Sequence, residues 1–150
     1  MKRLVKVLGW FFLIVIAGTW FYTNSLIGVD KQVKNYYRVL KKEIKEVGYK
    51  PSVFVISGRR WKWDNDLLSK FGGAAKNSRH KLGEAIDIIV LDINQDGKSD
   101  ARDVDIVYEI LDRQIIKDKG GLGTYKNENG FFNRQMVHFD CRGYKARWHR

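Results

Sequence analysis

The stretch Asn77-Ser-Arg-His-Lys-Leu-Gly-Glu-Ala-Ile-Asp87 decides how the rest of this chain is interpreted. It has the pattern Ser-x-His-x-x-Gly-x-Ala-x-Asp and leads from a loop into the apolar segment 85–91. His80 and Asp87 are seven residues apart with two small residues, Gly83 and Ala85, between them, so the chain can bend and place both side chains on one metal ion. A charge within a buried strand is costly unless it is paired or binds a metal. The stretch therefore predicts that His80 and Asp87 are metal ligands.

A second histidine that fits this site lies far downstream. His138 stands in the segment Val-His-Phe-Asp140, which has the apolar character of a strand. Two histidines and one carboxylate leave the fourth position of a tetrahedral zinc ion open, as in catalytic rather than structural zinc sites. The sequence thus predicts a zinc site made by His80, Asp87 and His138.

These motifs, in this order, resemble the zinc D-Ala-D-Ala carboxypeptidase family of peptidoglycan peptidases, whose fold is shared with the amino-terminal domain of hedgehog proteins. The family's upstream Ser-Gly-x-Arg motif is matched by Ser57-Gly-Arg-Arg60, and its downstream segment by a Gly-rich turn at 120–125 followed by His138-Phe-Asp140. The resemblance covers roughly residues 50–150. It implies an α+β domain with a small antiparallel sheet and flanking helices.

The resemblance also implies a reaction. Zinc on the three ligands would lower the pKa of its water to about 7 and so supply hydroxide for attack on a peptide carbonyl. Arg60, which the family motif selects over Arg59, would stabilise the oxyanion or hold a substrate carboxylate. Ser78 would contact substrate or shape the turn. The alternative for Arg60 is an ordinary surface arginine.

The general base is where the sequence departs from the family. Members often carry Glu or Asp three residues before the last histidine, and here that position is Gln135, whose amide cannot accept a proton. Asp140 and His149 are the remaining candidates, and Asp140 is expected to share a strand face with His138. If neither serves as base, the domain binds zinc and substrate without efficient cleavage.

A second cation site is indicated directly after the Asp87 strand. The segment 92–103 has oxygen side chains at loop positions 1, 3, 5, 9 and 12 and Gly at position 6, which is the pattern of a calcium loop. The loop resembles those of dockerin modules. The alternative is an Asx-rich turn with a helix cap at Asp100 or Asp103. The predicted Ca²⁺ ligands, with Lys98 contributing its carbonyl, are Asp92, Asn94, Asp96, Lys98, Asp100 and Asp103.

Residues 1–23 form a segment of a different character. A basic start precedes an uncharged run, 7–22, that is rich in large apolar residues and ends in Trp20-Phe-Tyr22. Such a run is a signal peptide or a membrane anchor, and its aromatic end suits the outer membrane interface. An uncleaved single-pass anchor in the cell membrane, with residues 24–150 outside the cytoplasm, is favoured over secretion after cleavage.

The remaining periodicity predicts one α+β domain. Segments 31–47 and 103–116 have apolar residues at helical spacing, so each is expected to form an amphipathic helix. A short helix is expected at 61–71. Strands are expected at 52–57, 85–91 and 135–141.

The net charge of +11 is spread along the chain. Nucleic acid, anionic lipid and an acidic cell-wall polymer are all compatible partners for such a charge, and solubility alone also explains it. No nucleic-acid recognition motif accompanies the charge, so nucleic acid is not expected as a partner. Peptidoglycan peptides and the membrane are the expected partners. Three functions are compared: a membrane-anchored zinc peptidase, a zinc- and calcium-stabilised module that binds wall peptide or a partner protein, and a basic nucleic-acid-binding protein tethered to the membrane, for which the charge is the only support.

Overall fold

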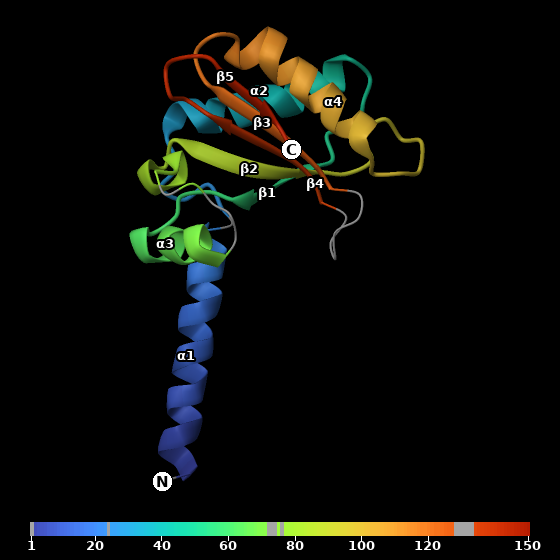
Figure 1. Ribbon diagram of the computed structural model, residues 1–150. Coiled ribbons are helices and arrows are strands. Elements are labelled where there is room, and N and C mark those ends of the chain that lie inside the picture. Colours follow the sequence, from blue (N-terminus) through green and yellow to red (C-terminus); the bar gives the residue numbers. More distant parts are fainter. Residues whose placement is uncertain (1, 24, 72–74, 76, 128–133) are drawn as a thin grey trace.

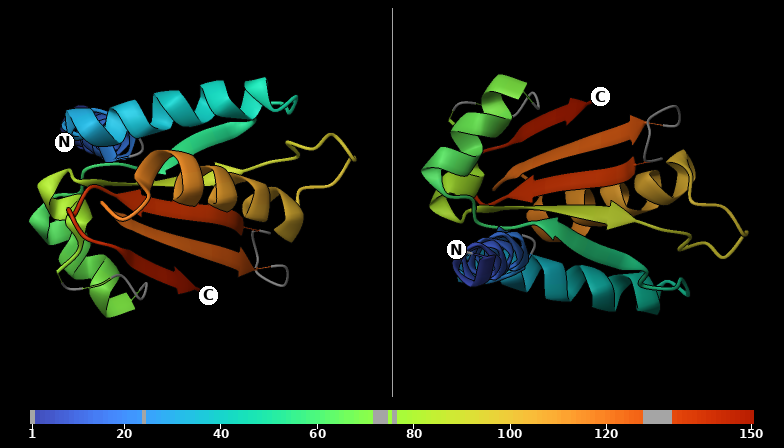
Figure 2. Two further views of the ribbon diagram at one scale, coloured as in Figure 1. Left: turned by 90° about the horizontal axis from the view of Figure 1, so that it is seen from above. Right: turned by 90° about the horizontal axis from the view of Figure 1, so that it is seen from below.

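The structure is a computed structural model that describes residues 2–23, 25–71, 75, 77–127 and 134–150. A five-stranded sheet forms the centre of an α+β domain, as expected from the sequence (Figure 1). Helices α2 and α4 cover one face of the sheet, whereas α1 and α3 lie on the side of the other face (Figures 1 and 2). The elements in chain order are α1 (Lys2–Thr23), α2 (Lys31–Glu46), β1 (Val53–Ser57), α3 (Lys62–Phe71), η1 (Arg79–Leu82), β2 (Ala85–Val90), α4 (Ala101–Ile110), η2 (Leu111–Ile116), β3 (Gly121–Asn127), β4 (Arg134–Asp140) and β5 (Ala146–His149).

The sheet is mixed, so the expected antiparallel arrangement describes three of the four strand pairings but not the last one. Its strand order is β1-β2-β4-β3-β5, and the first three pairings are antiparallel. The last strand, β5, pairs with β3 in parallel. The strands β4 and β5 lie on opposite sides of β3. The connection between them therefore crosses β3, and β5 then runs parallel to β3.

The core lies between the sheet and the helices α2 and α4. Helix α2 begins after Asp30, whose side chain accepts a hydrogen bond from the Gln32 N–H, and it buries an apolar stripe made by Val33, Tyr36, Leu40 and Ile44. Alternate residues of the strands, among them Ile86, Ile88, Val137 and Phe139, complete the same cluster. Because side chains alternate along a strand, the residues between these point to the opposite face, where the metal-ligating side chains lie.

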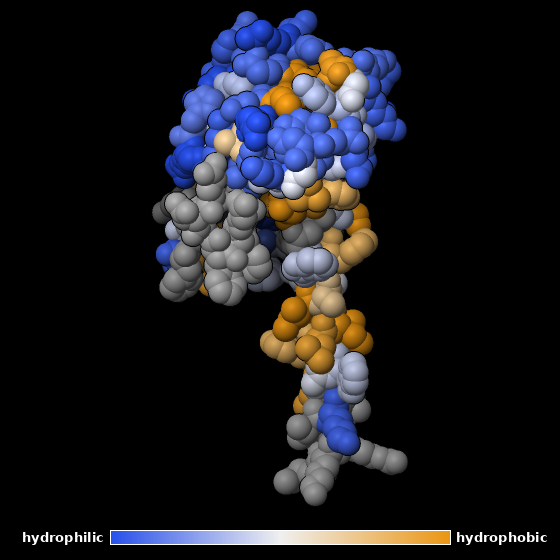
Figure 3. Space-filling view, turned by 90° about the vertical axis from the view of Figure 1, so that its right-hand side faces the viewer, coloured by the Kyte–Doolittle hydropathy of each residue, from blue (hydrophilic) through white to orange (hydrophobic). Residues whose placement is uncertain are grey.

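Helix α1 extends away from the domain, with its amino-terminal end far from the sheet (Figure 1). Large apolar side chains are exposed along it, and Figure 3 shows hydrophobic residues gathered on α1 beneath a mostly hydrophilic domain surface. Within the described residues, no helix is both long enough and apolar enough to cross a membrane.

Two strands were not expected from the sequence. Residues 120–125 were predicted as a glycine-rich turn, but most of that segment belongs to β3. The glycine at position 123 is required by packing, because a Cβ there would lie 2.1 Å from the Trp148 ring. The tail that carries Trp148 is itself a strand, β5, held against β3.

Candidate metal centre

Three elements bring the predicted zinc ligands together. His80 lies on the short helical turn η1, Asp87 on β2 and His138 on β4. Asp87 and His138 are directly opposite each other in the antiparallel pairing of β2 with β4. Side chains that are opposite on one sheet face are close enough to contact, so the sheet itself positions two of the three ligands.

The motif residues around His80 shape the turn that carries it. The Ser78 side chain caps η1 by accepting a hydrogen bond from the His80 N–H at 3.3 Å. Gly83 ends the turn with a φ of +76°, and a Cβ at this position would lie 2.4 Å from the Gly28 carbonyl oxygen. Glycine is therefore required at position 83 both by its conformation and by the space around it. Ser78 is placed as a cap of the turn.

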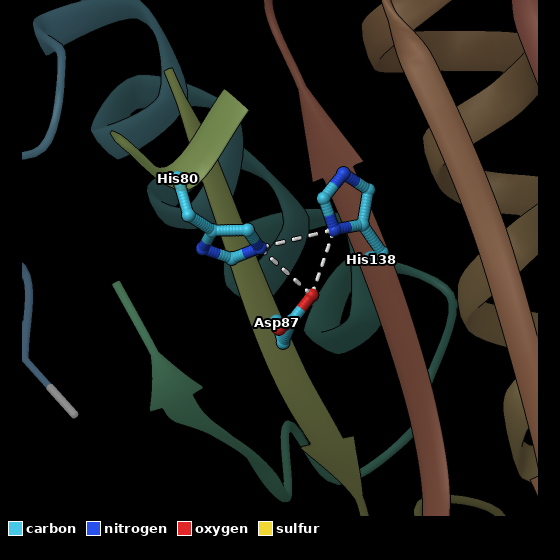
Figure 4. Close-up of side chains that lie close together, drawn as sticks. All are labelled: His80, Asp87 and His138. Atoms are coloured by element: carbon cyan, nitrogen blue, oxygen red, sulfur yellow. Dashed lines mark hydrogen bonds and ion pairs between the residues drawn. The ribbon is translucent and has the colours of Figure 1, made fainter. Parts of the chain in front are cut away.

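The three side chains point toward one common point (Figure 4). Nε2 of His80 lies 3.2 Å from Oδ1 of Asp87 and 3.3 Å from Nδ1 of His138. Nδ1 of His138 lies 2.7 Å from the same Asp87 oxygen. One ligand atom from each residue falls within 4.8 Å of the others, and all three residues are buried. This nitrogen, nitrogen and oxygen set can hold a metal ion.

Each ligand is fixed by a contact on its far side. The Nδ1 of His80 lies 2.7 Å from the Gly58 carbonyl oxygen, so Nε2 faces the cluster. The Nε2 of His138 lies 3.3 Å from Oδ2 of Asp140. Such outer contacts orient metal-binding side chains and fix the histidine tautomers.

Arg60 lies at the cluster, as the family motif predicts. Its Nη2 donates to Oδ2 of Asp87 at 2.7 Å, and its Nε donates to the Ser57 hydroxyl at 2.9 Å. The Arg60 N–H donates to the His80 carbonyl oxygen at 3.0 Å, which ties the motif around Ser57 to the turn η1. Arg60 is thus part of the site, whereas Arg59 is exposed.

Asp140 is buried behind His138 and not on the side of the cluster. Its carboxylate accepts hydrogen bonds from the Gly121 N–H at 2.9 Å and from the Arg142 guanidinium at 2.5–3.0 Å. The prediction that Asp140 shares a face with His138 is therefore confirmed. Its position fits orientation of the ligand and does not place it beside the open side of a metal.

The electrostatics of the centre favour a protonated His138 when no metal is bound. Burial alone would lower the pKa of His138, but hydrogen bonds and charge interactions with Asp140 and Asp87 outweigh it and raise the pKa to about 8. Burial alone would raise the pKa of Asp87, but His80 and His138 hold it well below its usual range. The charged carboxylate of Asp87 is the form that binds a cation.

The other two residues considered for the general base lie on the opposite face of the sheet. Gln135 is fully buried and alternates with His138 along β4, on the face that carries Val137. His149 contacts the Thr124 hydroxyl at 2.9 Å, and its ring lies 5.1 Å from that of Tyr108 on α4. His149, the second candidate base, therefore lies on the sheet face away from the metal cluster.

Trp148 is a neighbour of the site to which sequence reasoning gave no role. Its ring lies 5.2 Å from the His138 ring, and its Nε1 donates to the Tyr125 hydroxyl at 3.1 Å. The guanidinium of Arg142 lies 5.5 Å from the same indole. Glycine at position 123 makes this packing possible, and the contact depends on the pairing of β3 with β5, for which there was no signal in the sequence.

The predicted calcium loop forms the turn expected from the alternative interpretation. Asp100 caps α4, and its backbone N–H donates to Asp103, so the two residues make a reciprocal capping box. Asp103 is fully buried and also accepts from the Ile93 and Asn94 N–H groups. Asp92 accepts from the N–H groups of residues 96 and 97. Among the described residues, the cluster of His80, Asp87 and His138 is the group whose ligand atoms converge, so Ca²⁺ in this loop stays a prediction.

Comparison with known proteins finds no protein-family model and no curated protein that matches this chain. The function therefore has to be argued from the residues of the site and from the motifs that carry the family resemblance.

Proposed function

We propose that the protein is a membrane-anchored zinc peptidase that hydrolyses peptide bonds in peptidoglycan stem peptides or cross-links. The observation that carries the proposal is the convergence of His80, Asp87 and His138, each held by an outer partner. The resemblance to D-Ala-D-Ala carboxypeptidases supports the substrate class. The net charge of +11 supports attraction to an acidic wall polymer.

Zinc is the metal that suits these donors best. Two neutral imidazoles and one carboxylate form a common catalytic zinc set, and hard cations such as Mg²⁺ and Ca²⁺ prefer oxygen ligands. When bound, zinc would polarise a substrate carbonyl and provide hydroxide near neutral pH. Asp87 would use Oδ1 for the metal, because Oδ2 is already held by Arg60.

Arg60 would act on the substrate as well as on Asp87. Its side chain is 13% exposed, so the guanidinium is mostly shielded from water but can still be reached from the site. A guanidinium donates along several directions at once, and it can hold a ligand carboxylate with one edge while keeping Asp87 with another. Arg60 is therefore the residue that we assign to the substrate carboxylate or to the developing oxyanion.

A non-catalytic module that binds wall peptide or a partner protein is the second candidate. It is favoured by the placement of the two candidate bases: Asp140 is engaged behind His138, and His149 lies on the other sheet face. In such a module, zinc and the predicted Ca²⁺ would stabilise the fold.

Attachment to the cell membrane through α1 completes the proposal. The large apolar side chains exposed along α1 include Trp10, Phe11, Phe12, Ile14, Trp20 and Phe21. A helix that is apolar on every side does not belong on the surface of a soluble domain. The alternative, secretion after removal of residues 1–23, leaves the metal centre unchanged.

Metal content is the measurement that tests the site. The full-length protein, purified in detergent without chelator, is compared with the variants His80→Ala and His149→Ala by elemental analysis. We expect about one zinc per chain in the wild type and in His149→Ala, because His149 lies on the other sheet face. His80→Ala should lose the zinc. Zinc that persists in His80→Ala would overturn the proposed site.

Digestion of purified muropeptides then separates the two candidate functions. A peptidase should release an amino acid or separate a cross-link, and His80→Ala should give no product. Zinc-dependent binding of muropeptide with no product from any muropeptide would favour the binding module instead. His80→Ala serves as the inactive form, and His149→Ala serves as the control.

A further inference from the structure

Helix α3 and the residue before it expose large apolar side chains that have no role in the metal centre. Trp61, Trp63 and Leu67 are 51%, 60% and 53% exposed, and we call these three residues the α3 patch. Trp63 and Leu67 are four residues apart on the helix, so they share one face. Exposed tryptophans are uncommon on soluble surfaces, where they add no stability and invite association.

The α3 patch is continuous with the apolar surface of α1. The Trp61 ring stacks on the Tyr22 ring at the carboxyl end of α1, with the ring centroids 5.2 Å apart. In Figure 1, α3 lies beside the end of α1 that enters the domain, and it runs across the direction of α1. If the apolar part of α1 lies in a bilayer, α3 therefore lies at the surface of that bilayer.

The chemistry of α3 matches the interfacial layer of a bilayer. Tryptophan prefers the headgroup level, where its ring is buried and its N–H stays hydrated. Lys62 lies between the two tryptophans and pairs with Asp66 at 3.1 Å. Lys70 stands in the last turn of α3, and its long side chain can extend toward headgroup phosphates. The net charge of +11 adds long-range attraction to an anionic leaflet.

We propose that α3 lies on the surface of an anionic lipid bilayer, as a second membrane contact beside α1. The metal-ligating residues alternate with core residues along β2 and β4, so they lie on the sheet face away from α2 and α4. Helices α1 and α3 lie on the side of that face (Figures 1 and 2). With α3 on the headgroups, the centre faces the membrane side of the domain. This inference rests on the proposed attachment through α1 but not on the metal chemistry.

Fluorescence quenching by lipid measures this contact. The full-length protein is reconstituted into vesicles of phosphatidylcholine and phosphatidylglycerol whose acyl chains carry bromine, which quenches nearby tryptophans. The chain has five tryptophans. The double variant Trp61→Phe/Trp63→Phe keeps aromatic rings in place, and Trp148→Phe is the matched control beside the metal centre.

The proposal places four of the five wild-type tryptophans at or in the bilayer. The double variant removes two of these four, so it should lose about half of the quenched emission. Trp148→Phe should lose only unquenched emission. If the double variant loses only unquenched emission while Trp10→Phe/Trp20→Phe loses the quenched part, α1 is inserted and the α3 contact is overturned. If bromine quenches no tryptophan, the proposed attachment through α1 fails as well. Zinc content, measured on the same samples, reports the metal centre independently.

Discussion

The imidazole of His138 stands between two carboxylates: Nδ1 lies 2.7 Å from Asp87, and Nε2 lies 3.3 Å from Asp140. Asp87 is a neighbour within the metal cluster, whereas Asp140 is buried on the far side of the ring. A metal-binding histidine commonly donates its second N–H to a carboxylate, which fixes the tautomer and makes the ring a stronger ligand. Asp140 is thus best explained as the residue that positions His138.

The first prediction concerns this positioning role. Asp140→Asn should weaken zinc binding by about 10- to 100-fold, the usual cost of losing an outer carboxylate. The measurement is a competition titration against a chelating dye. Asp112→Asn is the control, because Asp112 pairs with Arg147 and not with a ligand of the cluster. Equal zinc affinity in Asp140→Asn and wild type would contradict the role.

A substitution of Arg60 should separate zinc binding from catalysis. With zinc at saturating concentration, Arg60→Ala should keep its metal and lose about 100- to 1000-fold in kcat/KM on muropeptides, the usual effect of removing an oxyanion donor. Arg60→Lys should recover only part of this activity, because lysine cannot contact Asp87 and substrate with one rigid fork. Full activity of Arg60→Ala would remove Arg60 from the mechanism.

The stability of the metal-free protein should depend on pH through His138. The folded-state pKa of about 8 lies above the unfolded value of 6.5, so protonated His138 stabilises the fold. This stabilisation, about 2 kcal/mol from the size of the shift, is complete below pH 6.5 and is lost as the pH rises through 8.

Denaturant unfolding of chelator-treated protein between pH 6 and 9 measures this effect. His138→Gln should be nearly independent of pH over that range, and His149→Gln should behave as wild type. Zinc replaces the proton on His138, so zinc binding should release a proton below pH 8 and tighten as the pH rises. A wild-type stability that stays constant across the range would contradict the assignment.

Much of the fold and of the site could be predicted from local patterns. The helix expected at 31–47 is α2, and the strand expected at 85–91 is β2. Both have strong local signals, namely an apolar stripe of helical period and an apolar run between polar loops. The motif around His80 and the polar residue within the apolar strand located two ligands, and the structure places them together with His138.

The features that the sequence could not predict depend on tertiary contacts. Three glycines made residues 120–125 look like a turn, yet Gly121 and Gly123 are strand residues that leave room for Arg142 and Trp148. The pairing of β5 with β3 is parallel and joins distant segments, so it has no local signal.

The loop at 92–103 gives a prediction with two distinguishable parts. Asp92→Ala should abolish any rise of the melting temperature on addition of Ca²⁺ and have a small effect in its absence. Asp103→Ala should cost about 2 kcal/mol or more even without calcium, because the buried N–H of Ile93 and the half-buried N–H of Asp100 lose their acceptor. If calcium does not change the wild-type melting temperature, the loop is a cap and turn only.

The last prediction uses the contact between Gly123 and Trp148. A Cβ at position 123 would lie 2.1 Å from the indole, so Gly123→Ala must displace a ring that packs 5.2 Å from the His138 ring. Overpacking of this kind costs about 1–3 kcal/mol, and the displaced ring should also weaken zinc binding. Gly18→Ala is the control, because a Cβ at that position of α1 meets nothing within 4 Å. Denaturant unfolding and zinc titration of both variants check the prediction. If Gly123→Ala lowers stability but leaves zinc affinity at the wild-type value, Trp148 supports the sheet without supporting His138.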